Sequence, residues 1–222
     1  VLDKLNWRYA TKVFDSSKKV SKEDLNILLD AARLSASSYG LQPYHFFVIE
    51  DSEVRSKLRK ASWNQAQITD ASYLLVLANK PNFDESLVDN YIDNIIETRG
   101  VSKKDVEGYS QMMKGALLGL PDEQKKSWTS DQTYITLGNL MTIAAEMEID
   151  TCPMEGFDEA EYNEILGLND KNLNASVVLA IGYRADDDET QHYPKVRYSR
   201  EQIITHISTT NSPPINFLPF IS

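Results

Sequence analysis

The sequence predicts an α+β fold, in which a small sheet is flanked by helices and one long helix runs through the centre. Three short apolar runs, rich in β-branched and aromatic residues, are typical of buried strands; they are 45–49, 73–78 and 175–182. Longer segments with helical periodicity stand between them, at 52–61, 86–98, 103–118, 127–147 and 159–166. A chain of 222 residues without internal repeats is long enough for one domain with a substantial core.

The first strong helix signal comes before these segments. Ser21 is followed three positions on by Asp24, which is a typical helix start. Apolar residues then recur on one helical face, at Leu25, Leu28, Leu29 and Ala32. We expect this helix to end before the turn-forming segment 37–40.

The segment 127–147 is apolar on nearly every side, which predicts a central, buried helix. One small sheet would not cover all of its faces, so part of the surface is expected to meet a partner. After this helix, the residues Cys152 to Phe157 are predicted to form a turn that Pro153 helps to set. His45 lies in the first apolar run and is predicted to be a packing residue.

Composition argues against several classes of function. The net charge of -10 is unfavourable for a protein whose main partner is a nucleic acid. No apolar run reaches the ~18 residues of a membrane span, and the first residues do not look like a signal peptide. Together with the single cysteine, Cys152, these features predict a cytoplasmic protein without a membrane partner.

Motifs for a protein-based catalytic centre are missing as well. The three histidines are scattered, so no metal site is predicted. Neither a dinucleotide-binding glycine fingerprint nor a P-loop is present, and Cys152 has no activating partner nearby in sequence. A cofactor that brings its own reactivity fits this pattern best.

Two cationic clusters stand at opposite ends of the chain. Arg8 and Lys12 lie near the beginning, and Lys195 and Arg197 lie near the end of the predicted domain. Such side chains could direct several donors at one phosphate, and arginine has a planar fork suited to that anion. Each cluster by itself is more typical of a solvated surface. Their combination with other motifs favours a ligand site.

These motifs occur in a recognisable order. They are Arg8-x-x-Thr11-Lys12-x-Phe14-Asp15, Ser37-Ser38-x-x-x-Gln42-Pro43, Asn64, Asp70-Ala71-Ser72, Gly138-Asn139, Pro153-x-Glu155-Gly156-Phe157 and Pro194-Lys195-x-Arg197. From residue 2 to 207 the chain resembles the FMN-dependent nitroreductase family, in particular its oxygen-insensitive NAD(P)H nitroreductase and dihydropteridine reductase branch. The resemblance implies a mixed, mainly antiparallel sheet and an intertwined homodimer with active sites at the interface.

The resemblance also implies which residues bind the flavin. They are Arg8, Tyr9, Ala10, Lys12, Ser37, Ser38, Gln42, Asn64, Gln67, Pro153, Met154, Glu155, Gly156, Lys195 and Arg197. Arg8, Lys195 and Arg197 would anchor the phosphate. Lys12 would lie at the N1/C2 edge of the ring, and Asn64 at its pyrimidine edge. Main-chain N–H groups of Glu155 and Gly156 would face the N5/O4 side, with Gly156 allowing close approach to the ring.

In this family the segment of Ser37, Ser38 and Gln42 comes from the other subunit. The alternative is local, since serines after a helix often begin a turn. Two positions depart from the family pattern. Gln67 stands where the branch often has a second lysine, and Ala10 stands where a small hydroxyl residue is usual. We expect the flavin to be less oxidising and to have one phosphate donor fewer.

The implied activity is transfer of electrons from NADH or NADPH, through tightly but non-covalently bound FMN, to nitroaromatics, quinones or similar flat acceptors by an alternating mechanism. No catalytic side chain is implied, because the flavin carries the chemistry and Lys12 tunes it. One alternative is a flavin-binding module for storage or sensing. Another is a reductase of the same fold for an aldehyde, an enone or a halogenated phenol. The segment 109–120 and Trp128 could form either a lid or part of the core.

The domain is expected to span 1–207, and 208–222 has a different character. This tail combines two adjacent prolines with several apolar residues. We interpret it as an extended arm on a partner subunit. The alternative is a disordered terminus or a non-native extension.

Overall fold

Four strands in the order β1-β2-β4-β3 form the centre of the molecule. They are β1 (Tyr44–Ile49), β2 (Tyr73–Asn79), β3 (Asp150–Met154) and β4 (Asn174–Gly182) in the computed structural model, which describes residues 1–207. The three strand pairings are antiparallel, and an isolated bridge between Ala10 and Thr151 is parallel. The predicted mixed, mainly antiparallel sheet is therefore confirmed. The predicted arm, 208–222, lies outside the described residues.

The two inner strands match their sequence signals. Every residue of β2 is buried, and Val76 pairs with Val178 in the middle of the β2–β4 ladder. Both strands extend only slightly beyond the predicted runs 73–78 and 175–182. Long uninterrupted apolar runs are expected here because each strand is covered on both faces.

The prediction of a buried strand at 45–49 is only partly right. β1 pairs with β2 alone, so it is an edge strand among the described residues, and most of it is half-buried. His45, predicted to be a packing residue, is exposed. Aromatic and β-branched residues favour any strand, and they do not distinguish an edge from the centre.

The predicted turn at 152–157 begins too early. Residues 150–154 form β3, and Pro153 lies inside this strand opposite Leu179. β3 is also an edge strand, where proline is tolerated because one side of the strand has no ladder partner. The turn itself starts after Met154.

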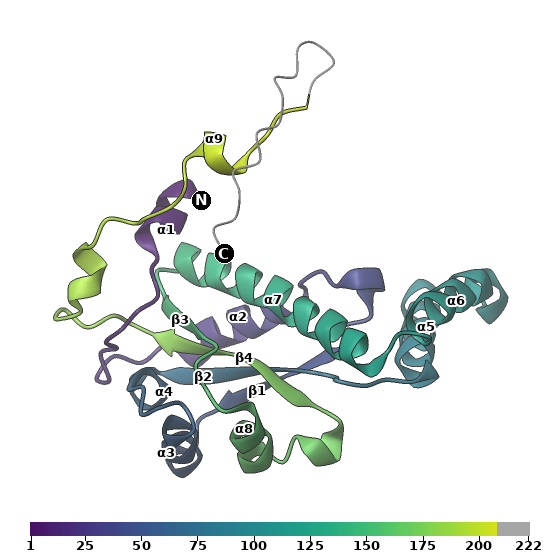
Figure 1. Cartoon of the computed structure of the whole chain (residues 1–222), viewed down its shortest axis with the longest axis horizontal. Helices are drawn as coiled ribbons and strands as arrows, with labels where there is room; N and C mark the ends of the chain where they lie inside the picture. Colours follow the sequence, from purple (N-terminus) through teal and green to yellow (C-terminus); the bar gives the residue numbers. More distant parts are fainter. Residues whose placement is uncertain (208–222) are drawn as a thin grey trace, which may run out of the picture.

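Helices cover the two faces of the sheet (Figure 1). One face meets α2 (Lys22–Arg33) and α7 (Asp122–Glu146), and alternate strand residues such as Leu75 and Leu77 pack there with Leu28 and Leu140. The other face meets α3 (Ser52–Lys60), α4 (Gln67–Asp70) and α8 (Glu159–Leu166). Both cores are built by the period-2 alternation of the same strands.

The helix starts agree with the sequence where a cap residue marks them and differ where the first turn is polar. Ser21 caps α2 as predicted, since its hydroxyl accepts a hydrogen bond from the Asp24 N–H. α7 begins at Asp122, before the predicted start at Ser127, because its first turn is polar and shows no apolar periodicity. Acidic residues there are favourable to the helix dipole. α7 is also not buried all round, because Tyr134 and Ile135 on its outer side are 38% and 48% exposed.

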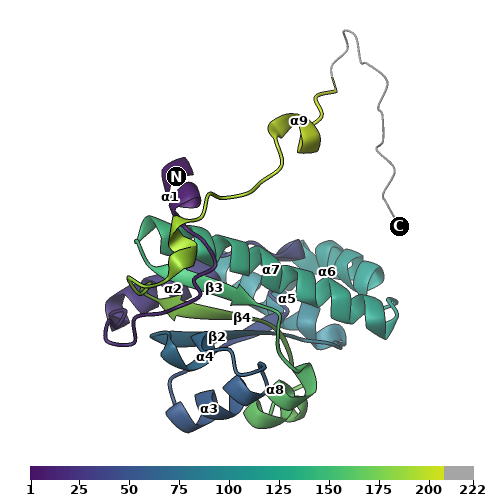
Figure 2. The ribbon, with the colours of Figure 1, turned by 60° about the vertical axis from the view of Figure 1, so that its left-hand side comes forward.

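At one end of the sheet, α5 (Glu85–Arg99) and α6 (Lys103–Leu117) form a helical pair with its own small core (Figures 1 and 2). Met113 and Leu117 are buried in it, and Trp128 packs against it. These residues therefore belong to a core in this chain. Tyr109 is partly exposed and donates a hydrogen bond to the Tyr39 carbonyl.

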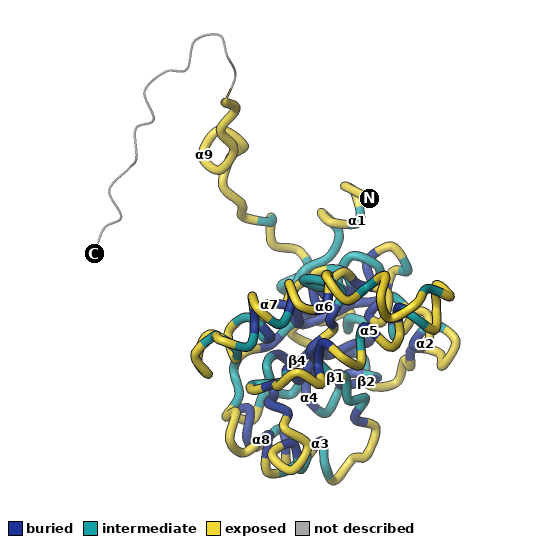
Figure 3. Tube along the Cα trace, turned by 90° about the vertical axis from the view of Figure 1, so that its right-hand side faces the viewer, coloured by how far each residue is buried: buried dark blue, intermediate teal, exposed yellow. Residues whose placement is uncertain are grey.

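At the opposite end, α1 (Leu2–Trp7) lies beside the segment that follows β4 (Figures 1 and 2). This segment contains η3 (Glu189–His192) and α9 (Arg200–Ile203), and α9 is exposed and stands away from the body (Figure 3). The two other short 3-10 turns are η1 (Ser38–Gly40) and η2 (Asn169–Lys171). Within residues 1–207, no helix has both the length and the apolar character needed to cross a membrane.

Candidate functional site

The two cationic clusters meet in one cavity of about 490 Å³ at the α1 end of the sheet. We call Arg8, Lys12, Lys195 and Arg197 the cation cluster; all four line this cavity. Three further predicted residues, Tyr9, Ala10 and Pro153, line it as well. The loop after α1 supplies the first two cations, and the segment after η3 supplies the other two. Folding therefore brings together residues that are almost 190 positions apart.

The cation cluster is electrostatically unfavourable without a counterion. Burial and the positive charge of Arg197 lower the pKa of Arg8. Burial, Arg8 and Arg197 together lower the pKa of Lys195. No cation of the cluster forms an ion pair with a carboxylate among residues 1–207. The Nε atom of Arg8 is buried and has no hydrogen-bond partner in this part of the chain. This arrangement suits an anion, because a buried donor without a partner is costly.

The donors of the cluster differ in how far they are already engaged. Lys195 Nζ donates to the carbonyl oxygen of Leu5 at 2.5 Å and also to that of Arg8. It thereby ties the C-terminal segment to the end of α1. Arg197 is exposed and donates only to its neighbour, the Val196 carbonyl, at 2.6 Å. Lys12 is exposed, and its side chain forms no hydrogen bond or ion pair within residues 1–207.

Next to the cation cluster, Arg184 is held by a buried carboxylate. Its Nε atom lies 2.8 Å from Asp150 Oδ1, and its main-chain N–H donates to Asp150 Oδ2 at 2.9 Å. The guanidinium carbon lies 4.1 Å from the ring centroid of Trp7 and 4.6 Å from that of Tyr9. Cation–π contacts of this kind hold the two residues that flank Arg8. Sequence reasoning did not select Arg184 or Asp150, since neither belongs to a local motif.

A second group of predicted residues meets around the turn after β3. Gln65 Nε2 donates to the Gly156 carbonyl at 2.7 Å, so the loop that contains Asn64 packs on this turn. Trp63 and Asn64 adopt left-handed backbone angles, with φ of +51° and +60°. This conformation is uncommon for residues other than glycine and identifies a constrained loop. Trp63, which sequence reasoning missed, is 72% exposed there.

Gly156 lies close to the loop that contains Trp63 and Gln65. A Cβ atom at this position would lie 2.8 Å from the Trp63 ring and 3.1 Å from Gln65 Nε2. The absence of a side chain at Gly156 therefore permits close approach to Trp63 within the same chain. The prediction that the Glu155 and Gly156 N–H groups face a flavin remains a proposal.

Glu155 itself is exposed and accepts a hydrogen bond from Tyr134 Oη at 2.6 Å. Burial and this bond raise the pKa of Tyr134. Met154 is buried in β3, and Gln67 begins α4. None of these residues lines the cavity of the cation cluster.

Ser37, Ser38 and Gln42 do not line that cavity either. Ser37 Oγ accepts from the Gln42 N–H at 3.0 Å, and Gln42 Nε2 donates to the Arg33 carbonyl at 2.8 Å. The Ser38 N–H donates to Gln132 Oε1 at 2.7 Å. Within one chain these hydrogen bonds close the loop after α2. This agrees with the alternative that the two serines begin a local turn. Gly40 is required in this loop, because its φ is +81° and a Cβ there would meet the Tyr91 hydroxyl at 2.4 Å.

Cys152 lies in β3 and is 3% exposed. Burial raises the pKa of its thiol, although Lys12 and Arg8 act in the opposite direction. A buried, protonated thiol is a poor nucleophile, in agreement with the sequence prediction. Within the described residues, no group of three or more histidine, cysteine, aspartate and glutamate side chains could hold a metal ion.

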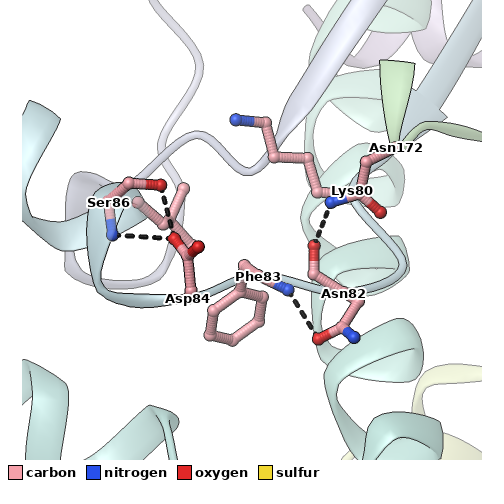
Figure 4. A pocket seen from close by; sticks show the side chains of 7 residues that line it. Lys80, Asn82, Phe83, Asp84, Ser86 and Asn172 are labelled. Atoms are coloured by element: carbon pink, nitrogen blue, oxygen red, sulfur yellow. Dashed lines mark hydrogen bonds between the residues drawn. The ribbon is translucent and has the colours of Figure 1, made fainter. Parts of the chain in front are cut away.

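A second cavity, of about 400 Å³, lies where the chain leaves β2 and enters α5 (Figure 4). Several of its polar groups are hydrogen-bonded to one another. Asn172 Nδ2 donates to the Asn82 carbonyl at 2.7 Å, and the Phe83 N–H donates to Asn82 Oδ1 at 2.8 Å. The carboxylate of Asp84 caps α5. None of the predicted site residues lines this cavity, so it is not the candidate site.

Comparison with known proteins agrees with the resemblance. A family model described as "Nitroreductase family" matches residues 5–183. A Staphylococcus saprophyticus protein provisionally named an NAD(P)H nitroreductase is 38% identical, over 92% of this chain and 95% of its own. A Bacillus subtilis protein with the same provisional name is 37% identical, over 92% and 96%.

A solved structure described as a nitroreductase in complex with FMN, from Exiguobacterium sibiricum, superposes with a TM-score of 0.77. It is 24% identical, and the match covers 93% of this chain and 96% of the other. At that identity the match establishes the fold alone. The family model and the curated relatives, each spanning most of the chain, show that the protein belongs to the nitroreductase family.

Proposed function

We propose that the protein is an FMN-dependent NAD(P)H oxidoreductase whose flavin phosphate binds at the cation cluster. Its acceptors are nitroaromatics, quinones or similar flat molecules. The observation that carries the proposal is the unpaired state of the cluster. Arg8, Lys195 and Arg197 line one cavity and form no ion pair with a carboxylate in residues 1–207, and the buried Arg8 Nε lacks a partner there. The phosphate of a bound FMN would supply the missing negative charge.

The residues fit this cofactor. Arg8 and Arg197 have donors available to a phosphate, and Lys195 adds positive charge beside them although its amine already donates to two carbonyls. Charge-assisted bonds from guanidinium groups to phosphate are among the stronger hydrogen bonds in proteins. When bound at these residues, FMN would supply the redox chemistry between NADH or NADPH and the acceptor, in an alternating reaction.

The remaining predicted residues tune and orient the ring. Lys12 is exposed and lines the cavity, and its positive charge would stabilise negative charge at the ring edge, by the logic of an oxyanion hole. Gln67 is uncharged, whereas the family branch often has lysine at this position. The flavin is therefore expected to be less oxidising than in that branch. Asn64 and the turn at Glu155 and Gly156 bind the ring edges.

The absorption spectrum of the purified protein tests this function. We expect flavin bands that bleach under anaerobic conditions on addition of NADH or NADPH and return with an added quinone or nitroaromatic. A protein that stays colourless and gains no flavin bands with added FMN would contradict the proposal. Bands that neither nicotinamide bleaches would favour a module for flavin storage or sensing.

We further propose that the active unit is a homodimer, with Ser37, Ser38 and Gln42 reaching the partner's flavin. Apolar side chains are exposed on the α2–α7 layer, with Ile27 52% and Ile135 48% exposed. The segment after η3 also exposes apolar residues and projects from the body (Figure 3); they include Tyr193, Val196, Tyr198, Ile203 and Ile207. Exposed apolar surface of this extent supports burial against a second copy.

Light scattering at micromolar concentration should report twice the 25.2 kDa chain mass. Ile135→Glu places a charge on the outer side of α7 and should produce monomers. Lys57→Glu also changes charge, but on the exposed side of α3 beyond the other sheet face, and should leave the dimer intact. A stable monomer that binds FMN and turns over would rule out both the dimer and the cross-subunit role of Ser37, Ser38 and Gln42.

A further inference from the structure

Asp188 is the buried member of an acidic run. Asp186 and Asp187 are exposed, whereas Asp188 is 1% exposed and caps η3. Acidic runs are usually solvated, and an isolated buried carboxylate is strongly unfavourable unless hydrogen bonds compensate it. The structure therefore has to provide a reason for this burial.

The two oxygens of Asp188 serve different segments of the chain. Oδ2 accepts from Tyr9 Oη at 2.8 Å, from the Lys12 N–H at 2.8 Å and from the Val13 N–H at 3.0 Å. Oδ1 accepts from the N–H of Thr190 at 3.0 Å and also from its hydroxyl. One oxygen thus holds the N-terminal loop, and the other holds the turn that leads into the C-terminal segment.

These bonds keep the carboxylate charged. Burial raises the pKa of Asp188, but bonds from Thr190, Val13, Tyr9 and Lys12 outweigh it and lower the pKa to about 2. Asp188 therefore carries a full negative charge between two positively charged segments at neutral pH. The positive charges of the two segments are unfavourable to each other, and burial, Arg8 of the N-terminal loop and Arg197 lower the pKa of Lys195.

We propose that Asp188 is a positioning residue that joins the two cationic segments and so makes the cluster selective for a phosphorylated flavin. The inference rests on the proposed function, because the phosphate is that of FMN. Asp188 accepts hydrogen bonds from Tyr9 and from Thr190. Arg8 is next to Tyr9 in the chain, and Lys195 and Arg197 follow Thr190. Asp188 lies outside the lining of the cavity and acts through these neighbours.

Asp188→Asn tests the inference, because an amide of the same shape has only one acceptor oxygen. Either the N-terminal loop or the turn at Thr190 must therefore lose its hydrogen bonds to residue 188. The affinities of apo-protein for FMN and for riboflavin, which lacks the phosphate, are measured by titration. We expect FMN affinity to fall by roughly 10- to 100-fold, the equivalent of lost hydrogen bonds to a charged group, and riboflavin affinity to change by less than about threefold. The preference for FMN over riboflavin should therefore collapse.

Thr190→Val provides a milder variant, since it removes only the hydroxyl bond to Oδ1. It should also lower the preference for FMN over riboflavin, by a smaller factor. If Asp188→Asn does not fold, Thr190→Val still tests the inference. Asn163→Ala is the matched control. Asn163 is buried and binds the Ala175 N–H and Asn174 in the α8 layer, away from the cation cluster. Its loss should destabilise the fold without changing the FMN-to-riboflavin ratio.

The outcomes separate this inference from the proposed function. If the unmodified protein binds no FMN, the proposed function fails and the role of Asp188 falls with it. If the unmodified protein prefers FMN and Asp188→Asn and Thr190→Val keep that preference, the role of Asp188 is refuted while the proposed function stands. Equal weakening of both flavins would show that Asp188 supports the fold alone.

Discussion

Arg8 stands between Trp7 and Tyr9 in the chain, and Arg184 stacks on the rings of both, but of these two arginines only Arg184 has a carboxylate counterion in residues 1–207. Arg184 is paired with the buried Asp150 and stacks on Trp7 and Tyr9. Arg8 forms no ion pair in the described chain, and its Nε is buried without a partner. The protein thus contains one arginine that is paired with a carboxylate, with Arg184 Nη2 2.6 Å from Asp150 Oδ1, and one that is not.

The difference indicates two separate roles. A cation whose charge is neutralised by a carboxylate inside the chain stabilises the fold and has little capacity for an anionic ligand. A half-buried cation among like charges reduces stability until an anion arrives. Substitutions at the two arginines should therefore separate stability from flavin binding.

The largest effect is expected for Arg184→Ala. It leaves Asp150, 3% exposed, as a buried charge without its partner, which should lower the free energy of unfolding by about 3–5 kcal/mol. Denaturant unfolding of the apo-protein measures this. Adding Asp150→Asn in the same chain should recover part of the loss, because it removes the unpaired charge. A loss below about 1 kcal/mol would mean that the pair does not support the fold.

Arg8→Ala is expected to act on binding. FMN affinity should fall by about 1.5–3 kcal/mol, the range for hydrogen bonds to charged groups, and riboflavin affinity should fall much less. The apo-protein should lose little stability, since the substitution also removes repulsion from Arg197 and Lys195. Arg197→Ala should act in the same direction with a smaller factor, because that side chain is exposed. A large loss of apo-protein stability with unchanged FMN affinity would mean that Arg8 supports the fold and not flavin binding.

The smallest effect concerns pH. The positive form of Lys195 favours a phosphate, and burial together with Arg8 and Arg197 lowers its pKa. As pH rises through this lowered pKa, the charge is lost and FMN affinity should decrease, beginning below the ordinary lysine pKa of about 10.4. We expect a change of about 1 kcal/mol, as for a partly exposed ion pair. Titrations with FMN across alkaline pH measure it. Lys195→Met should abolish the decrease, and an unchanged profile in that variant would exclude Lys195 as its source.

Local patterns were sufficient for the helices and inner strands. Ser21 and the apolar face after it predicted α2, since a cap and a 3.6-residue period are properties of neighbouring residues. Continuous apolar runs predicted β2 and β4, because strands buried on both faces need them. The same patterns were ambiguous at the edges of the sheet. His45 was expected to be buried and is exposed, and Pro153 was expected in a turn and lies in β3.

In the candidate site, the motifs predicted that the four cations meet, and all four line one cavity. The motifs missed the residues that hold these cations in place. Asp188 belongs to an acidic run that resembles solvated surface, although the spacing to Thr190 is a weak signal for a local cap. Arg184 and Asp150 give no local signal. Trp63, which occupies the space next to Gly156, was visible only as one aromatic residue in a polar loop.

By itself, the sequence determined the family, the α+β class, the main helices and the two clusters of positive charge, because these follow from residue types and their spacing. The tertiary structure alone decided which cations are satisfied. Tyr9 meets Asp188 across 179 positions of the chain, and Arg184 meets Asp150 across 34. A carboxylate exerts its effect over a few ångströms, so the pairing of charges depends on distances in space that sequence spacing does not record.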